Sequence, residues 1–232
     1  MLSMPEATWS FSTARLPPFE RAAALHSLRE RGILPLEPLP GCFPQAEFTK
    51  WDLPGISVLS GTLGGLRQSG TPADAGVNDD MLLGVNLAGE STVCHLGREI
   101  RLRSGDAVFF SCAESGITAH RPNPVNFLGL RLPRKDLAPL VTNLDDVVIR
   151  LIPGETGSLQ LLATYLRCLG AGQRPDSPDL GLAVAGHIHD LIGLSIGALL
   201  FLVADFLEGT IVGRVVDRQR RPRHVGGTWA QR

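Results

Sequence analysis

The feature that most constrains the fold of this chain is a run of short, strand-like segments between residues 42 and 133. Segments rich in Val, Leu and Phe are separated there by Gly, Pro, Asn and Asp, the residues that favour turns. No helical period competes with this pattern. Several short strands at near-regular spacing predict a β-sandwich or barrel. The expected strands are residues 56–70, 81–90, 91–97, 99–105, 106–112 and 126–133.

Helices are expected before and after this run. Two prolines precede residues 19–32, which are rich in helix-forming residues. Beyond the last strand, residues 157–170 place leucines at helical spacing, and a second helix is expected to start near Asp179, an N-cap residue type. Because only a short segment separates these two helices, we expect them to form an antiparallel hairpin.

The chain is therefore expected to divide into four parts. Its 232 residues suffice for one large domain and a short appendage. Residues 1–18 are expected to be disordered or extended, and residues 19–150 to form an N-terminal helix and a β-barrel. Residues 151–208 are expected to be a helical dimerisation region, and residues 209–232 a basic, disordered tail.

Charge is balanced over the whole chain but not along its length. The chain has 22 basic and 23 acidic residues, yet residues 214–232 hold six Arg against one Asp. A solvated, unstructured end is one interpretation of this tail, and a non-specific contact with phosphates is the alternative. The overall balance gives no sign of a nucleic-acid surface elsewhere.

The sequence carries no sign of secretion or of a membrane anchor. Its N-terminus lacks a basic start followed by an apolar stretch. The fourteen uncharged residues 191–204 fall short of the ~20 that a spanning helix needs, so we expect a buried helix there. Four cysteines without C-x-x-C spacing are expected to be reduced. A cytoplasmic protein without a membrane partner is the prediction.

The hairpin at residues 89–110 resembles the metal-binding hairpin of the cupin superfamily. Gly89 and His95 match that family's pattern, but Gly97 stands where the second metal-binding His would be. The position of the family's carboxylate ligand falls on Arg98. The resemblance therefore implies a cupin-like barrel whose metal ligands are missing.

The residues themselves lead to the same expectation. Glu99 alternates with Ile100 and should point to solvent. His120 adds at most one nitrogen, whereas a transition metal needs three or four converging ligands. His187 and His189, two residues apart on a helix, point in roughly opposite directions. We therefore expect no metal, no cofactor and no catalytic residues.

Four residues remain candidates for binding a small molecule. His95 shares a strand face with Val93, so it either forms a hydrogen-bonded part of the barrel lining or contacts an effector. Asn86 is ambiguous in the same way. The predicted ligand-binding residues are His95, Asn86, Arg98 and His120.

Two arginines, Arg67 and Arg131, are further positions at which an acidic effector could be received. An exposed or salt-bridged Arg is the commoner case. The identity of the effector is therefore left open by the sequence.

Residues from about 19 to 198 resemble, as a whole, the N-terminal sensing domain of AraC-type transcription regulators. The segments that carry this resemblance are LEPLPG after the first helix, GREIRLRSGDAVFF, FLGLRLPRKDLAPLV (127–141), IPGETGSLQLLATYLRCL (152–169) and GHIHDLIGLSIGA (186–198).

The resemblance implies both a fold class and a set of partners. The fold would be mainly β with α: a cupin-like, jelly-roll β-barrel that senses an effector, followed by a C-terminal helical hairpin that dimerises. The implied partners are a small-molecule effector and a second copy of this chain or a related regulator. Apolar stripes on the two helices supply the predicted dimerisation residues: Leu159, Leu162, Leu166, Leu180, Val184 and Ile188.

The resemblance ends at Ala198. In AraC-type regulators two helix-turn-helix units follow, and the 34 residues after Ala198 are too few to hold them. We therefore expect a truncated regulator without autonomous, sequence-specific DNA binding, whose reading frame left the ancestral one soon after this point. The alternative is a small cupin enzyme, an isomerase or a metal-dependent dioxygenase, which needs a metal or a convergent acid–base pair. We predict that the chain is not an enzyme.

Overall fold

The structure is a computed structural model that describes residues 8–31, 33–70, 79–95, 97–113, 116–141, 143–172 and 175–197. The predicted basic tail at residues 209–232 and the point at which the family resemblance ends lie outside these residues.

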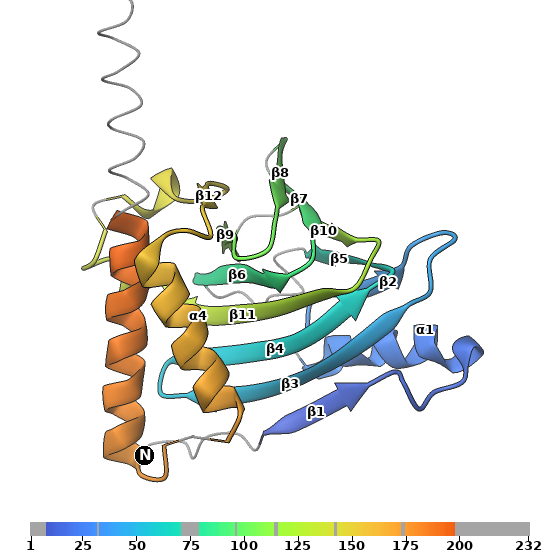
Figure 1. Ribbon diagram of the computed structural model, residues 1–232, viewed down its shortest axis with the longest axis horizontal. Coiled ribbons are helices and arrows are strands. Elements are labelled where there is room, and N and C mark those ends of the chain that lie inside the picture. The colour runs from blue at the N-terminus through green and yellow to red at the C-terminus, as the bar shows by residue number, and fades with distance from the viewer. Residues whose placement is uncertain are drawn as a thin grey trace, which may run out of the picture.

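Seven antiparallel strands form the larger of two sheets, in the order β1-β3-β4-β11-β6-β9-β12 (Figure 1). Strand β1 comes from the predicted N-terminal extension and pairs with the edge of β3. The bounds of the strands are β1 Trp9–Ser12, β3 Gln45–Leu53, β4 Ile56–Gly64, β6 Asp80–Ala88, β9 Ala107–Ser111, β11 Val125–Pro133 and β12 Leu151–Ile152.

Five shorter antiparallel strands form the second sheet, in the order β2-β5-β10-β7-β8. Their bounds are β2 Leu36–Pro38, β5 Leu66–Gly70, β7 Ser91–His95, β8 Arg98–Leu102 and β10 Ile117–Arg121. Residues that alternate along the strands of both sheets line a common interior. This arrangement confirms the predicted mainly β, cupin-like barrel.

The helices lie outside the barrel. Helix α1, Pro18–Ser27, continues into the 3₁₀ turn Leu28–Arg31, and its proline stands at the first helical position, where a missing N–H costs nothing. Short turns of helix, α3 at Arg134–Leu137 and η2 at Leu144–Asp146, follow β11.

Two longer helices, α4 at Gly157–Gly170 and the helix Pro178–Gly197, lie side by side against one face of the larger sheet (Figure 1). They run antiparallel, since Ser158 contacts Ser195 while Tyr165 contacts His187. The predicted C-terminal helical hairpin is confirmed.

The larger sheet has two unlike faces. On the outer face, Leu130 of β11 pairs with Leu83 of β6 and Val58 of β4, and all three side chains are buried. These residues belong to one hydrophobic cluster with Leu159 and Leu162 of α4. The helical hairpin therefore closes this face with close-packed apolar side chains.

The strands that were predicted are present, with one informative difference. Residues 56–70 were predicted as a single segment, but the structure divides them into β4 and β5 at Gly65. Gly65 has a φ of +63°, and a Cβ there would lie 2.2 Å from the carbonyl oxygen of Phe43. This glycine lets the chain cross from one sheet to the other. Strands β1, β2, β3, β10 and β12 were not among the predicted ones.

Candidate functional site

A cavity of about 640 Å³ lies between the two sheets. This is the size of a pocket that encloses a small molecule. Its walls come from β3, β4, β6, β9 and β11 of the larger sheet and from β5, β7, β8 and β10 of the smaller one. Apolar side chains from both sheets, and from the segment before β2, form much of the lining: Ile33, Leu34, Leu53, Ile56, Leu59, Leu82, Val85, Val93, Leu102, Val108, Phe110, Ile117, Ala119, Phe127 and Leu128.

Two glycines form the floor of the cavity. Gly129 of β11 and Gly84 of β6 are directly paired across the centre of the larger sheet. A Cβ on Gly129 would touch only Leu59, at 3.8–3.9 Å, and a Cβ on Gly84 would meet only the ring of Phe110, at 3.4 Å. Neither position has a backbone conformation reserved for glycine. The absent side chains therefore leave room above the sheet rather than permit a turn.

Two ion pairs lie at the cavity wall. Arg131 donates from Nε to Asp80 at 2.7 Å, and Lys50 donates to Asp52 at 3.4 Å. All four side chains are partly buried. Arg131, one of the two arginines considered as an anion receptor, is thus already paired with a carboxylate. The other, Arg67, is exposed and pairs with Glu37.

Arg121, the last residue of β10, differs from these cations. Its side chain lines the cavity and the residue is only 9% exposed. One guanidinium nitrogen, Nη1, donates to Gln68 Oε1 at 3.1 Å, and the group lies 5.8 Å from the centre of the Phe127 ring. Its buried Nε has no hydrogen-bond partner in the described part of the chain. Burial lowers the pKa of Arg121 to about 10, so it remains charged at neutral pH.

Asn86 lines the cavity, but its side chain is already engaged. Its Nδ2 donates to Ser91 Oγ at 3.0 Å and to the Leu102 carbonyl at 3.2 Å, while Oδ1 accepts from Ser91. Asn86 belongs to the larger sheet, and its two partners belong to the smaller one. The side chain therefore holds the sheets together at this end of the barrel.

His95 is 1% exposed and lies on the strand face of Ser91 and Val93, as predicted, although it is not part of the cavity lining. Arg98 and His120 need correction. Arg98 is exposed near the tip of the β7–β8 hairpin, and His120 is half-buried on the side of β10 opposite the cavity, where it pairs with the position of Arg67. Neither residue lines the cavity.

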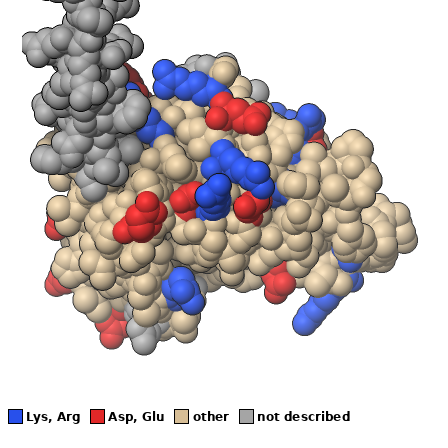
Figure 2. Space-filling model, turned by 45° about the horizontal axis from the view of Figure 1, so that its top comes forward, with Lys and Arg blue, Asp and Glu red and all other residues tan. Residues whose placement is uncertain are grey.

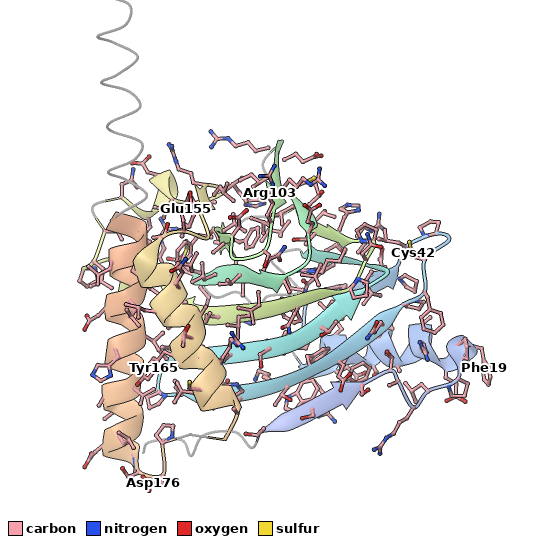
Figure 3. The ribbon with its side chains drawn as sticks, in the orientation of Figure 1. Phe19, Cys42, Arg103, Glu155, Tyr165 and Asp176 are labelled. Carbon is pink, nitrogen blue, oxygen red and sulfur yellow. The ribbon has the colours of Figure 1, made fainter. Side chains whose placement is uncertain are left out.

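The predicted dimerisation residues also need correction. Five of the six are buried within the chain, because the helical stripe faces the chain's own sheet and not a partner: Leu159, Leu162, Leu166, Val184 and Ile188. Leu180 is exposed. The outer face of the hairpin exposes Leu161 and Leu194, and Tyr165 of α4 contacts His187 of the neighbouring helix there (Figure 3).

The described residues contain no group of three or more His, Cys, Asp or Glu side chains that could hold a metal ion.

Cys112 borders the cavity, and burial raises the pKa of its thiol. On the face seen in Figure 2, basic and acidic side chains are interspersed. This face offers no continuous basic stripe of the kind that follows a phosphate backbone.

One helix among the described residues, Pro178–Gly197, is long and apolar enough to cross a membrane by length and composition. Its apolar side chains Val184, Ile188, Ile192 and Ile196 are buried in the same cluster as the larger sheet. A core helix passes the same test of length and composition.

The sequence held signals for the residues that the predictions missed. Arg121 alternates with Ile117 and Ala119 along the strand, which places it on the inner face. The predicted ligand-binding residue was instead the neighbouring His120. Gly84 and Gly129 interrupt otherwise apolar strands, and a glycine inside a strand often marks a close approach or an open space.

Comparison with known proteins gives a family and a fold. A family model described as an AraC-binding-like domain matches residues 38–196. The crystal structure of the AraC-like transcriptional activator CuxR is similar at a TM-score of 0.68 and 15% identity, over 82% of this chain and 70% of that one. The cupin domain of an XRE family regulator from Enterobacter cloacae reaches a TM-score of 0.30 at 21% identity, over 34% of this chain and 84% of that one. No curated protein matches.

Proposed function

We propose that this chain, which belongs to the family of AraC-binding-like domains, is a sensing domain that binds a small-molecule effector between its two sheets. Membership rests on the family model, which matches residues 38–196 and so covers more than half of the chain. The fold is that of the AraC-like activator CuxR. The observation that carries the proposal is the cavity of about 640 Å³ above the paired glycines Gly84 and Gly129.

A cavity of this kind lowers the stability of the fold unless a ligand fills it. Protein interiors are normally packed as densely as organic crystals, and empty apolar space forfeits dispersion contacts. A side chain at Gly129 would fill part of the space without meeting the backbone at close range. A small molecule that fills the same space would stabilise the fold by its binding free energy.

The chemistry at the cavity wall favours binding over catalysis. Asp80 and Asp52 each accept from a basic side chain, and Asn86 is engaged with Ser91 and Leu102. These groups have partners within the fold, whereas an acid–base pair must be available to a substrate. We accordingly propose a regulator and not an enzyme, acting in the cytoplasm.

The cavity is tested with N-phenyl-1-naphthylamine, an uncharged dye whose fluorescence rises in apolar pockets. We expect saturable binding to the wild-type chain and its loss in Gly129→Leu. Gly186→Leu is the matched control, because Gly186 lies on an exposed helix face with nothing within 4 Å. Equal dye binding by wild type and Gly129→Leu, both folded, contradicts a ligand site between the sheets.

We further propose that a second copy of this chain, or a related regulator, packs on the outer face of the helical hairpin. Leu161 and Leu194 are each 63% exposed there, and Leu180 is 47% exposed. Large apolar side chains that a helical pair leaves exposed are candidates for an interface. Light scattering during size-exclusion chromatography should give a dimer for the wild type and a monomer for the double variant Leu161→Glu, Leu194→Glu. A wild-type monomer at micromolar concentration overturns this part.

A further inference from the structure

We propose that the effector is an organic anion, a carboxylate with an apolar body, whose charged group pairs with Arg121 inside the barrel. This inference rests on the proposed function, because it names the chemical class of the molecule that the same cavity would take.

The first step is the condition of Arg121 itself. A guanidinium carries five N–H donors, is always charged in proteins at neutral pH, and is costly to remove from water without compensation. Arg121 is 9% exposed, and it contacts the neutral amide of Gln68 and the ring of Phe127. Neither carries a negative charge, and the buried Nε has no acceptor among the described residues. Within the described part of the chain, the charge is thus held in the wall without a carboxylate partner.

The second step is a comparison within the same cavity. Arg131 and Lys50 are less deeply buried than Arg121, yet each has a carboxylate partner, Asp80 and Asp52 respectively. The two less buried cations of the cavity thus each have an acid beside them, whereas the described residues place none beside Arg121. An uncompensated buried charge is a cost to the empty protein, and an incoming anion removes that cost. This arrangement favours a ligand whose anionic group completes the pair.

The third step is the rest of the wall. The carboxylate and guanidinium planes fit each other through two parallel hydrogen bonds, and Nε is one of the two donors in the usual side-on arrangement. Beyond Arg121, the lining contains Phe127, Ile117 and Val93, with the bare backbone of Gly129 on the opposite sheet. An aromatic or aliphatic body would bury its surface against these residues.

The test compares two probes of nearly the same shape, 2-naphthylacetate and its uncharged analogue 2-naphthylacetamide, by calorimetric titration of the full chain. The wild type should bind the carboxylate at least tenfold more tightly than the amide, as expected for a desolvated, charge-assisted pair. Arg121→Gln should lose this preference while still binding the amide. Arg67→Gln is the matched control: it removes the same charge from the same sheet on an exposed residue that pairs with Glu37.

The outcomes separate the inference from the function on which it rests. Equal binding of acid and amide by the wild type, or a preference that persists in Arg121→Gln, overturns the anion assignment and leaves the cavity as a ligand site. Absence of saturable binding by the acid also overturns it. If the uncharged naphthylamine dye then fails to distinguish wild type from Gly129→Leu, the proposed function falls as well. Arg121→Lys, which keeps the charge but loses the planar fork, should retain part of the preference.

Discussion

Two neighbouring rows of residues cross the same five strands of the larger sheet and differ strongly in the size of their side chains. The outward row is Trp51, Val58, Leu130, Leu83 and Phe109, each at most 2% exposed. The inward row, made of residues adjacent to these in each strand, is Lys50, Leu59, Gly129, Gly84 and Val108. The outward row consists of large, buried side chains, whereas the inward row has two glycines at its centre.

The difference teaches which face of the sheet maintains the fold and which is available for function. The outward row packs against the helical hairpin, where large apolar side chains leave no room. The inward row borders the cavity, together with two ion pairs and the guanidinium of Arg121, whose Nε has no hydrogen-bond partner among the described residues. Selection for stability alone would not leave glycines and a buried charge at the centre of a barrel.

The largest effect is expected on the outward row. Leu130→Ala removes a fully buried side chain from the layer beneath the hairpin and should lower the free energy of unfolding by about 2–5 kcal/mol. Leu59→Ala, on the inward row, should cost clearly less, since that side chain already borders empty space. Urea denaturation of both variants measures the difference. Equal losses would mean that the two faces are equally packed.

Enlarging a residue should lower the free energy of unfolding by unequal amounts on the two faces. Ala107 is 0% exposed, so Ala107→Leu should cost about 1–3 kcal/mol through overpacking. Gly129→Leu should cost little, because its first contacts lie at 3.8–3.9 Å. Thermal unfolding of the two ligand-free variants makes the comparison. A Gly129→Leu variant that is as unstable as Ala107→Leu would show that the inner space is not open.

Replacing Arg121 should stabilise the empty protein. Arg121→Met substitutes an apolar side chain for a buried, unpaired charge and should raise the free energy of unfolding by about 1 kcal/mol at neutral pH. Because burial lowers the pKa of Arg121 to about 10 in the fold, below its value in the unfolded chain, the unfolded chain binds more protons above about pH 10. Wild-type stability should therefore rise with pH in that window, and the advantage of Met should shrink. A destabilised Arg121→Met variant would instead assign the arginine a structural role.

The smallest effect concerns thiol reactivity. Burial raises the pKa of Cys112, so little of it is thiolate at neutral pH, whereas Cys168 is exposed. Iodoacetamide should label Cys168 first and Cys112 slowly, and 2-naphthylacetate should slow Cys112 further. Peptide mass spectrometry follows both sites. A Cys112 that reacts as fast as Cys168 would contradict the burial of its thiol at the cavity wall.

Much of the fold could be predicted from the sequence because its signals are local. Alternation and turn residues located the strands from β4 to β9 and β11, and leucine spacing located α4. Strand β3 was not predicted, because Phe48 and Trp51 are buried on opposite faces of it and the sequence therefore shows no simple alternation of apolar and polar residues. Strand β10 is only five residues long and reads as part of a loop.

The candidate site was harder to predict from the sequence than the fold, for a physical reason. An apolar stripe such as Leu159, Leu162 and Leu166 states that a helix face is buried, but not whether its partner is the same chain or another. In the same way, Asn86 and Arg121 both point inward, and only the three-dimensional neighbours reveal that Asn86 is satisfied and Arg121 is not. Partners that lie far apart in sequence decide both questions.

The most direct test is a crystal structure of the chain with 2-naphthylacetate. The account predicts the naphthyl ring over the backbone of Gly84 and Gly129 and a carboxylate oxygen within hydrogen-bonding distance of Arg121 Nε. A ligand bound outside the barrel, or an Arg121 whose Nε remains without the ligand's carboxylate while the cavity is occupied, would contradict it.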